Sequence, residues 1–285
     1  MLRTLLVMAA IAAVVWLLWR RYRTRAAVGA DGSADGDAPR VLPDSRLRAL
    51  LHEHVRLWRR LPESLQDDLL PRVREFMQRV PFEGAHGFEV TDTMRAVIAA
   101  QACIITLGHD DYPFDPLHGI TLHPDEFLVE ESEEDEETGV VTEGYRALSG
   151  QAHGSDRIVL SWRDVEEAGQ RDDGYNVVIH EFTHFLEHSR PGGDPTAHAA
   201  LESAHAALCD AVDRGEQTLL DPYGAEDLTE FLAVAAEFFF ERPRELRERH
   251  PLLYVLLRDS FGLDPAAWEP LAGDEASSMA GKLSS

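Results

Sequence analysis

The chain has 285 residues, 44% of them hydrophobic, and a formal net charge of −24 at pH 7. A chain of this length and apolar content is expected to be globular, with one or two domains and a sizeable core. Five arginines and no acidic residue lie in residues 1–25, so setting these five positive charges aside leaves −29 on the remainder. Nucleic acid phosphates would repel such a surface, which excludes direct DNA or RNA binding from the expected functions.

The first 25 residues predict an N-terminal membrane anchor. An uninterrupted apolar run extends from Leu5 to Trp19, and the arginine-rich segment 20–25 follows it. The run is shorter than the about 17–25 residues of a spanning helix, so flanking residues would have to extend it. A cleaved signal peptide is the alternative, but the run ends in tryptophan and arginine instead of small residues. The positive-inside rule then predicts a single-pass protein of the cell membrane with a cytoplasmic C-terminal domain.

Composition divides the rest of the chain into three parts. Residues 26–44 are rich in Gly, Ala, Asp and Pro, which predicts a flexible linker. Residues 45–270 carry the periodic apolar patterns of a folded domain, and residues 271–285 lack them, which predicts a disordered tail. Cys103 and Cys209 lie in apolar or alanine-rich stretches and are expected to be free, buried thiols.

Apolar residues recur at helical spacing in much of this domain. The predicted helices cover residues 45–60, 65–80, 93–107, 176–188, 196–214, 228–240 and 251–260. Short β-branched or aromatic runs predict strands at residues 120–122, 127–129 and 158–162. Helices around a small sheet predict an α+β domain.

An acidic run, Glu130–Glu137, lies between two of the predicted strands. Such a run predicts a solvated, flexible loop. The alternative is a docking surface for a basic partner or for cations, in which case the chain would act as an acidic, membrane-tethered scaffold.

An apolar predicted helix carries an H-E-x-x-H motif. His180 and His184 are four residues apart, so both imidazoles leave one face of the helix. Two neutral imidazoles there can hold one Zn²⁺ ion, while Glu181 can take a proton from a water without binding the metal. The alternative is a helix that carries two histidines by chance, since so short a motif also occurs without function.

A zinc site of this kind needs a third protein ligand and an open position for water. Glu230 and Glu237 lie two turns apart on an apolar face of the predicted helix 228–240, for which Asp227 or Thr229 is the expected N-cap. A buried carboxylate is costly unless it is paired or binds a metal. We therefore expect Glu230 to be the third ligand and Glu237 to accept a hydrogen bond from a ligand histidine. The alternative for either glutamate is a place at the edge of the buried face.

These motifs, taken in order, resemble the Mlc titration factor A family of zinc peptidases. The likeness extends from about Leu47 to about Asp264, and its further segments are Gly87–Val90, Ile120–Pro124 and Ile158–Val165. The resemblance implies a gluzincin, with a mostly helical, zincin-like domain similar to the catalytic domain of anthrax lethal factor. It also implies that Glu230 is the third zinc ligand.

The same resemblance assigns a role to Tyr223. Without the resemblance, the sequence Asp-Pro-Tyr-Gly from Asp221 predicts an ordinary turn as well as it predicts an active-site loop. The family's active-site tyrosine lies seven residues before the third ligand, which falls on Tyr223 and implies a hydroxyl that stabilises the oxyanion of the reaction. His188 lies one turn after His184 and is expected behind the ligands or at the surface.

The expected function is a zinc-dependent peptidase that hydrolyses peptide bonds with zinc-activated water and Glu181 as general base. Its substrate would be a peptide or protein, and both endopeptidase and aminopeptidase action stay open. The alternative is a zinc-containing binding module that sequesters a transcriptional repressor or another regulatory protein with little turnover, a partner that the name of the resembled family implies.

Overall fold

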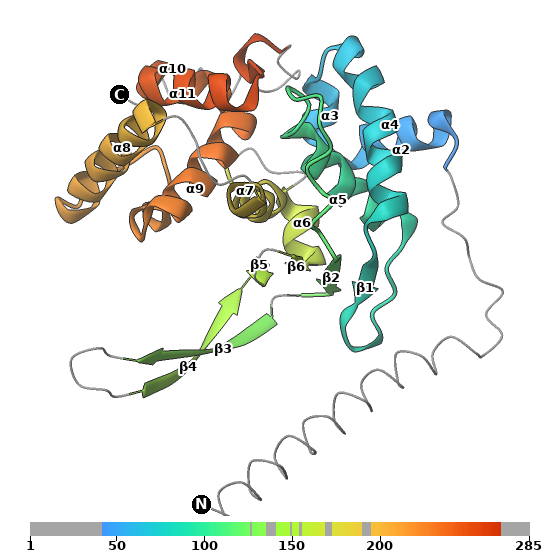
Figure 1. The fold of residues 1–285 in the computed structure, drawn as a ribbon, viewed down its shortest axis with the longest axis horizontal. Coiled ribbons are helices and arrows are strands. Elements are labelled where there is room, and N and C mark those ends of the chain that lie inside the picture. Colours follow the sequence, from blue (N-terminus) through green and yellow to red (C-terminus); the bar gives the residue numbers. More distant parts are fainter. Residues whose placement is uncertain are drawn as a thin grey trace, which may run out of the picture. The chain divides into compact units, whose positions relative to one another are not determined.

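The computed structural model describes most of the predicted domain (Figure 1). The described residues are 42–125, 127–134, 141–148, 150–153, 156–168, 173–189 and 195–268. The predicted anchor over 1–25, nearly all of the predicted linker and the predicted tail over 271–285 lie outside them. The predicted domain boundaries therefore stay predictions.

Four helices form the first part of the described chain, where the apolar periodicity predicts three. They are α2 (Asp44–His54), α3 (Arg56–Arg60), α4 (Glu63–Arg79) and α5 (Asp92–Ile104). The helix predicted over 45–60 is interrupted at Val55, a buried residue with extended backbone angles. Thr91 caps α5, because its hydroxyl accepts a hydrogen bond from the backbone N–H of Met94 at 3.3 Å.

Four short strands form the main sheet in the order β1-β2-β6-β5. They are β1 (Phe82–Gly84), followed by the short helix η1 (Ala85–Gly87), then β2 (Gly119–His123), β5 (Gly150–His153) and β6 (Arg157–Ser161). The first three of the ordered strands are parallel, and β5 pairs antiparallel with β6. Ile120 is in register with Ile158 and Leu122 with Leu160, and all four are buried. Strands buried on both faces appear as apolar runs, so the sequence predicts β2 and β6 but not the edge strands.

A second, two-stranded sheet consists of β3 (Phe127–Glu134) and β4 (Val141–Leu148), which pair antiparallel (Figure 1). The prediction of a loop is therefore wrong for Glu130–Glu134, which belong to β3, whereas residues 135–137 lie outside the described residues. Glutamate has a low β-propensity, so only the pairing with β4 makes these residues a strand.

Helix α7 (Val177–Ser189) carries the H-E-x-x-H motif. It contacts α5, α9, β5 and β6, and it contacts α6, the helix that follows β6 directly (Figure 1). The other elements are α6 (Trp162–Ala168), α8 (Pro195–Asp213), η2 (Pro222–Ala225), α9 (Leu228–Glu241), α10 (Pro243–Arg249), α11 (Pro251–Phe261) and η3 (Pro265–Ala267).

The apolar face of α7 packs into an aromatic cluster. The ring of Phe182 lies 5.8 Å from the rings of both Phe76 and Phe114, and the ring of Phe185 lies 6.3 Å from that of Phe114. All four side chains are buried. Their burial fixes the rotation of α7 about its own axis and turns its polar face towards α9.

The predicted α+β class is confirmed, since the described chain is mostly helical and contains a small, mostly parallel sheet. The predicted localisation is corrected: across the residues that the structure describes, no helix is long and apolar enough to cross a membrane. The apolar run from Leu5 to Trp19, on which that prediction depended, lies outside the described residues. It is also shorter than a spanning helix requires.

Candidate metal centre

The two histidines of the motif face each other along α7. Their Nε2 atoms are 3.1 Å apart, and their rings are 4.7 Å apart between centroids. Both side chains are largely buried, with 12% of the His180 side chain and 11% of the His184 side chain exposed. The spacing of four residues therefore places two nitrogen atoms side by side, as the sequence predicts.

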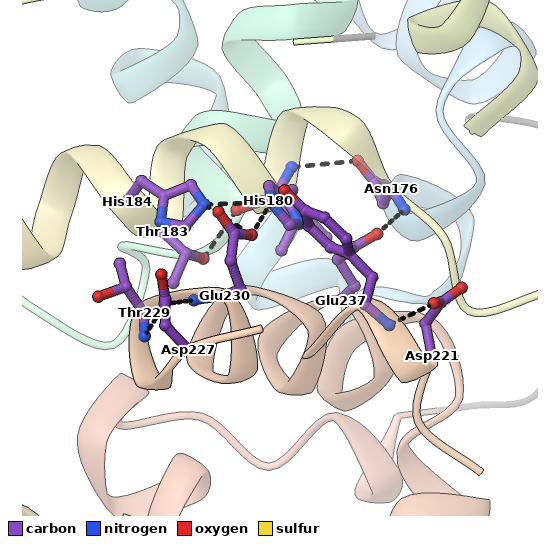
Figure 2. A network of polar contacts seen from close by, with 11 residues as sticks. Asn176, His180, Thr183, His184, Asp221, Asp227, Thr229, Glu230 and Glu237 are labelled. Carbon is purple, nitrogen blue, oxygen red and sulfur yellow. Dashed lines mark hydrogen bonds and ion pairs between the residues drawn. The ribbon is translucent and has the colours of Figure 1, made fainter. Parts of the chain in front are cut away.

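Helix α9 brings Glu230 to these nitrogens. Asp227 caps the helix, since its Oδ1 accepts hydrogen bonds from the backbone N–H groups of Thr229 and Glu230 at 2.8 and 2.9 Å. The Oε2 atom of Glu230 then lies 3.0 Å from Nε2 of His180 and 3.4 Å from Nε2 of His184. Figure 2 shows the two helices side by side, with these three side chains between them.

The three ligand atoms fit one small divalent ion. Atoms bound at about 2.0–2.1 Å to a tetrahedral ion lie about 3.3–3.4 Å from one another. The three separations here are 3.0, 3.1 and 3.4 Å. In the described part of the chain, this is the one group of three or more such residues whose ligand atoms come within 4.8 Å of one another. Two imidazoles and one carboxylate are a donor set that suits zinc and leaves a fourth position open.

Glu237 contacts the ring of His180 on the Nδ1 side. Its Oε1 accepts a hydrogen bond from Nδ1 of His180 at 2.7 Å, so that Nε2 is the ring nitrogen that faces Glu230 and His184. Burial raises the pKa of Glu237, and the contact with His180 opposes this rise. Burial alone would lower the pKa of His180, but hydrogen bonds to Glu230 and Glu237 outweigh it and raise that pKa to about 10. The two glutamates thus favour positive charge at His180.

Glu181 is buried next to the cluster, with 5% of the residue exposed. Burial raises the pKa of its carboxyl group to about 7, although charge on His180 and His184 would lower it. A carboxylate with a pKa near neutrality can both accept and release a proton under ordinary conditions.

Tyr223 also lies at the cluster. It belongs to η2, which contacts α8 and α9, and Oδ1 of Asp221 accepts a hydrogen bond from its backbone N–H at 2.9 Å. Its ring is 6.1 Å from the ring of His180 between centroids. His188, in contrast, is exposed, and its Nδ1 lies 3.1 Å from the carbonyl oxygen of His184. His188 is therefore a surface residue and does not belong to the cluster of His180, His184 and Glu230.

Sequence reasoning missed the polar residues behind Glu237. Asn176 and Glu241 are buried and contact each other between α7 and α9. An asparagine directly before the apolar helix and a glutamate one turn after Glu237 are the signals that point to them.

Comparison with known proteins matches the chain to a family of metallopeptidases and to proteins named Mlc titration factor A. A family model described as "Glucose-regulated metallo-peptidase M90" matches residues 38–262. The chain is 32% identical over 225 residues to Mlc titration factor A of Serratia proteamaculans, covering 73% of this chain and 83% of that protein. It is 33% identical over 192 residues to Mlc titration factor A of Pectobacterium atrosepticum, covering 62% and 71%. It is also 30% identical over 231 residues to "Uncharacterized protein slr2042" of Synechocystis sp., covering 76% and 84%.

Proposed function

The chain belongs to the family of glucose-regulated metallo-peptidases M90, as its resemblance to the Mlc titration factor A proteins predicts, and from this premise we propose that it is a zinc-dependent peptidase. The observation that carries the proposal is the convergence of His180, His184 and Glu230, whose ligand atoms lie within 4.8 Å of one another. In the proposal these three residues hold the ion, and Glu237 orients His180.

Zinc in this position would supply a Lewis acid that makes a water nucleophilic near neutral pH. Glu181 would accept the proton that such a water loses when its oxygen bonds to the carbonyl carbon of the peptide bond. When the carbon–nitrogen bond breaks, Glu181 passes this proton to the leaving amine and returns to its starting state. The raised pKa of Glu181 suits both transfers.

Tyr223 has the remaining role. Negative charge gathers on the carbonyl oxygen as the water adds, and a hydrogen-bond donor at that oxygen lowers the barrier. The position of the Tyr223 ring beside that of His180 supports the assignment of its hydroxyl as this donor.

Peptide hydrolysis by the purified protein tests the proposal, with fluorogenic peptides or unfolded casein as substrate. The parent should turn over substrate, and the Glu181→Gln and His180→Ala variants should not. Glu181→Gln should keep its zinc, whereas His180→Ala should lose it. Equal rates of peptide hydrolysis by all three proteins would contradict the proposal.

A second candidate is a binding module for a regulatory protein, and the name of the relatives favours it, since they are called Mlc titration factor A. In this case the chain would hold a repressor or a similar protein and have little turnover. Glu181→Gln separates the two functions, because a binding module needs no general base and the variant should bind its partner as the parent does. An acidic docking function of Glu130–Glu137 stays a prediction, and deletion of β3 and β4 would test it.

A further inference from the structure

Asn176, directly before α7, is completely buried and uses its whole side chain in hydrogen bonds. Its Nδ2 donates to Oε1 of Gln101 and to Oε1 of Glu241, each at 2.7 Å. Its Oδ1 accepts from the backbone N–H of Ile179 at 3.1 Å and so caps α7. Both N–H donors of the Asn176 amide group and its oxygen acceptor thus have hydrogen-bond partners, which fixes the amide in one orientation.

The backbone of Asn176 reaches the candidate metal centre through Glu237. Its N–H donates to Oε2 of Glu237 at 2.5 Å, while Oε1 of the same carboxylate accepts from Nδ1 of His180. The carboxylate is therefore held at both oxygens and cannot rotate without losing one bond. Figure 2 shows Asn176, directly before α7, and His180 on α7 above Glu237 on α9.

An ion pair holds the far side of Asn176. Oε2 of Glu241 lies 3.2 Å from Nη1 of Arg56, and both side chains are almost completely buried. Nη1 of Arg60 donates to the carbonyl oxygens of Phe240 and Glu241 at 2.9 and 3.0 Å, at the C-terminal end of α9. Arg56 and Arg60, both on α3, thus hold the Glu241 carboxylate and the backbone at the end of α9, respectively.

We propose that Asn176 is a positioning residue of the metal centre: it joins the start of α7 to α9 and holds Glu237 against His180. The inference rests on the proposed zinc site and deepens it, since it names a residue that binds neither metal nor substrate. A ligand histidine with a fixed ring needs no reordering when the ion binds, so loosening its partner weakens metal binding, typically by about 10–100-fold.

A purely structural role makes a different prediction. An N-cap residue contributes to the stability of its helix, and its loss lowers the stability of the whole protein without a specific effect on one ligand. Asn176→Ser separates the two roles because serine is also a strong N-cap, while it removes both Nδ2 donations. The backbone N–H to Glu237 remains, but the amide that anchors it is gone.

The matched control is Thr91→Ala, which removes the exposed N-cap of α5 and touches none of these residues. The measurement is the zinc dissociation constant of the parent and both variants, obtained by competition with a chromophoric chelator, together with the melting temperature of each metal-free protein. We expect zinc binding about tenfold or more weaker in Asn176→Ser, with one zinc per chain at saturation, and unchanged in Thr91→Ala.

Parent-like zinc affinity in Asn176→Ser, with a lowered melting temperature, would overturn the inference and leave only the capping role. A parent that binds no zinc would overturn the proposed function and this inference with it. If Asn176→Ser does not fold, Gln101→Met takes its place, because it removes one acceptor of the amide and leaves Asn176 intact. A smaller loss of zinc affinity supports the inference, and an unchanged affinity overturns it.

Discussion

Replacement of Glu181 by glutamine should stabilise the metal-free protein, and the gain should grow as the pH rises from about 4.5 to about 7. The carboxyl group is buried, and burial raises its pKa from 4.5 to about 7. Below the pKa of the unfolded chain, the carboxyl group is protonated in both the folded and the unfolded state, so it does not lower the free energy of unfolding. The loss of unfolding free energy begins at about pH 4.5 and reaches its full size above about pH 7, where the folded protein holds a buried carboxylate away from water.

The size of this effect follows from the same two values. Their difference corresponds to about 3 kcal/mol of unfolding free energy, since each pKa unit is worth about 1.4 kcal/mol. Glutamine has the same shape and no charge, so it avoids the cost. We expect the variant and the parent to have equal stability near pH 4.5, and the variant to gain up to about 3 kcal/mol by pH 8.

Urea denaturation of both metal-free proteins across this pH range is the assay, with the midpoint and slope fitted at each pH. A His188→Gln variant is a control, since His188 is exposed and should show no such gain. A glutamine variant that is less stable than the parent at pH 8, or a difference independent of pH, would refute the reasoning, because the carboxylate would then not be desolvated by the fold.

Four other outcomes are expected. Glu181→Gln should lower kcat by about 10²–10⁴-fold with its zinc content unchanged, as peptide assays and metal analysis would show; a change below tenfold is incompatible with a general base. Zinc at about 1,000 times its dissociation constant should add about 4 kcal/mol to the parent in calorimetry and nothing to His184→Ala. Zinc affinity should fall on acidification, because His180, with its pKa near 10, must give up a proton to bind the ion; an affinity independent of pH, in chelator competition, would contradict this. Phe182→Ala should cost about 3–5 kcal/mol in urea unfolding, since the ring is completely buried among three others; a loss below 1 kcal/mol would contradict the packing.

Local patterns in the sequence predicted much of the candidate site. The four-residue spacing of His180 and His184 and the two-turn spacing of Glu230 and Glu237 each depend on helix geometry alone. The structure brings the two helices together and places Asp227 as the N-cap of α9. The metal-binding and catalytic roles of these residues stay proposals.

The parts that escaped prediction depend on contacts between distant segments. Strand β4 exists only through its pairing with the acidic β3, and β5 only through its pairing with β6. The same holds for the contacts of Asn176 with Gln101 and Glu241, residues 75 and 65 positions away. Periodicity within one segment carries no information on such pairs.

Zinc content measured by mass spectrometry on the purified protein tests the central claim most directly, with His184→Ala and Glu230→Ala beside the parent. We expect about one zinc per chain in the parent and close to none in either variant, all three being folded by circular dichroism. A parent without zinc, or a Glu230→Ala variant that keeps a full equivalent, would contradict the account.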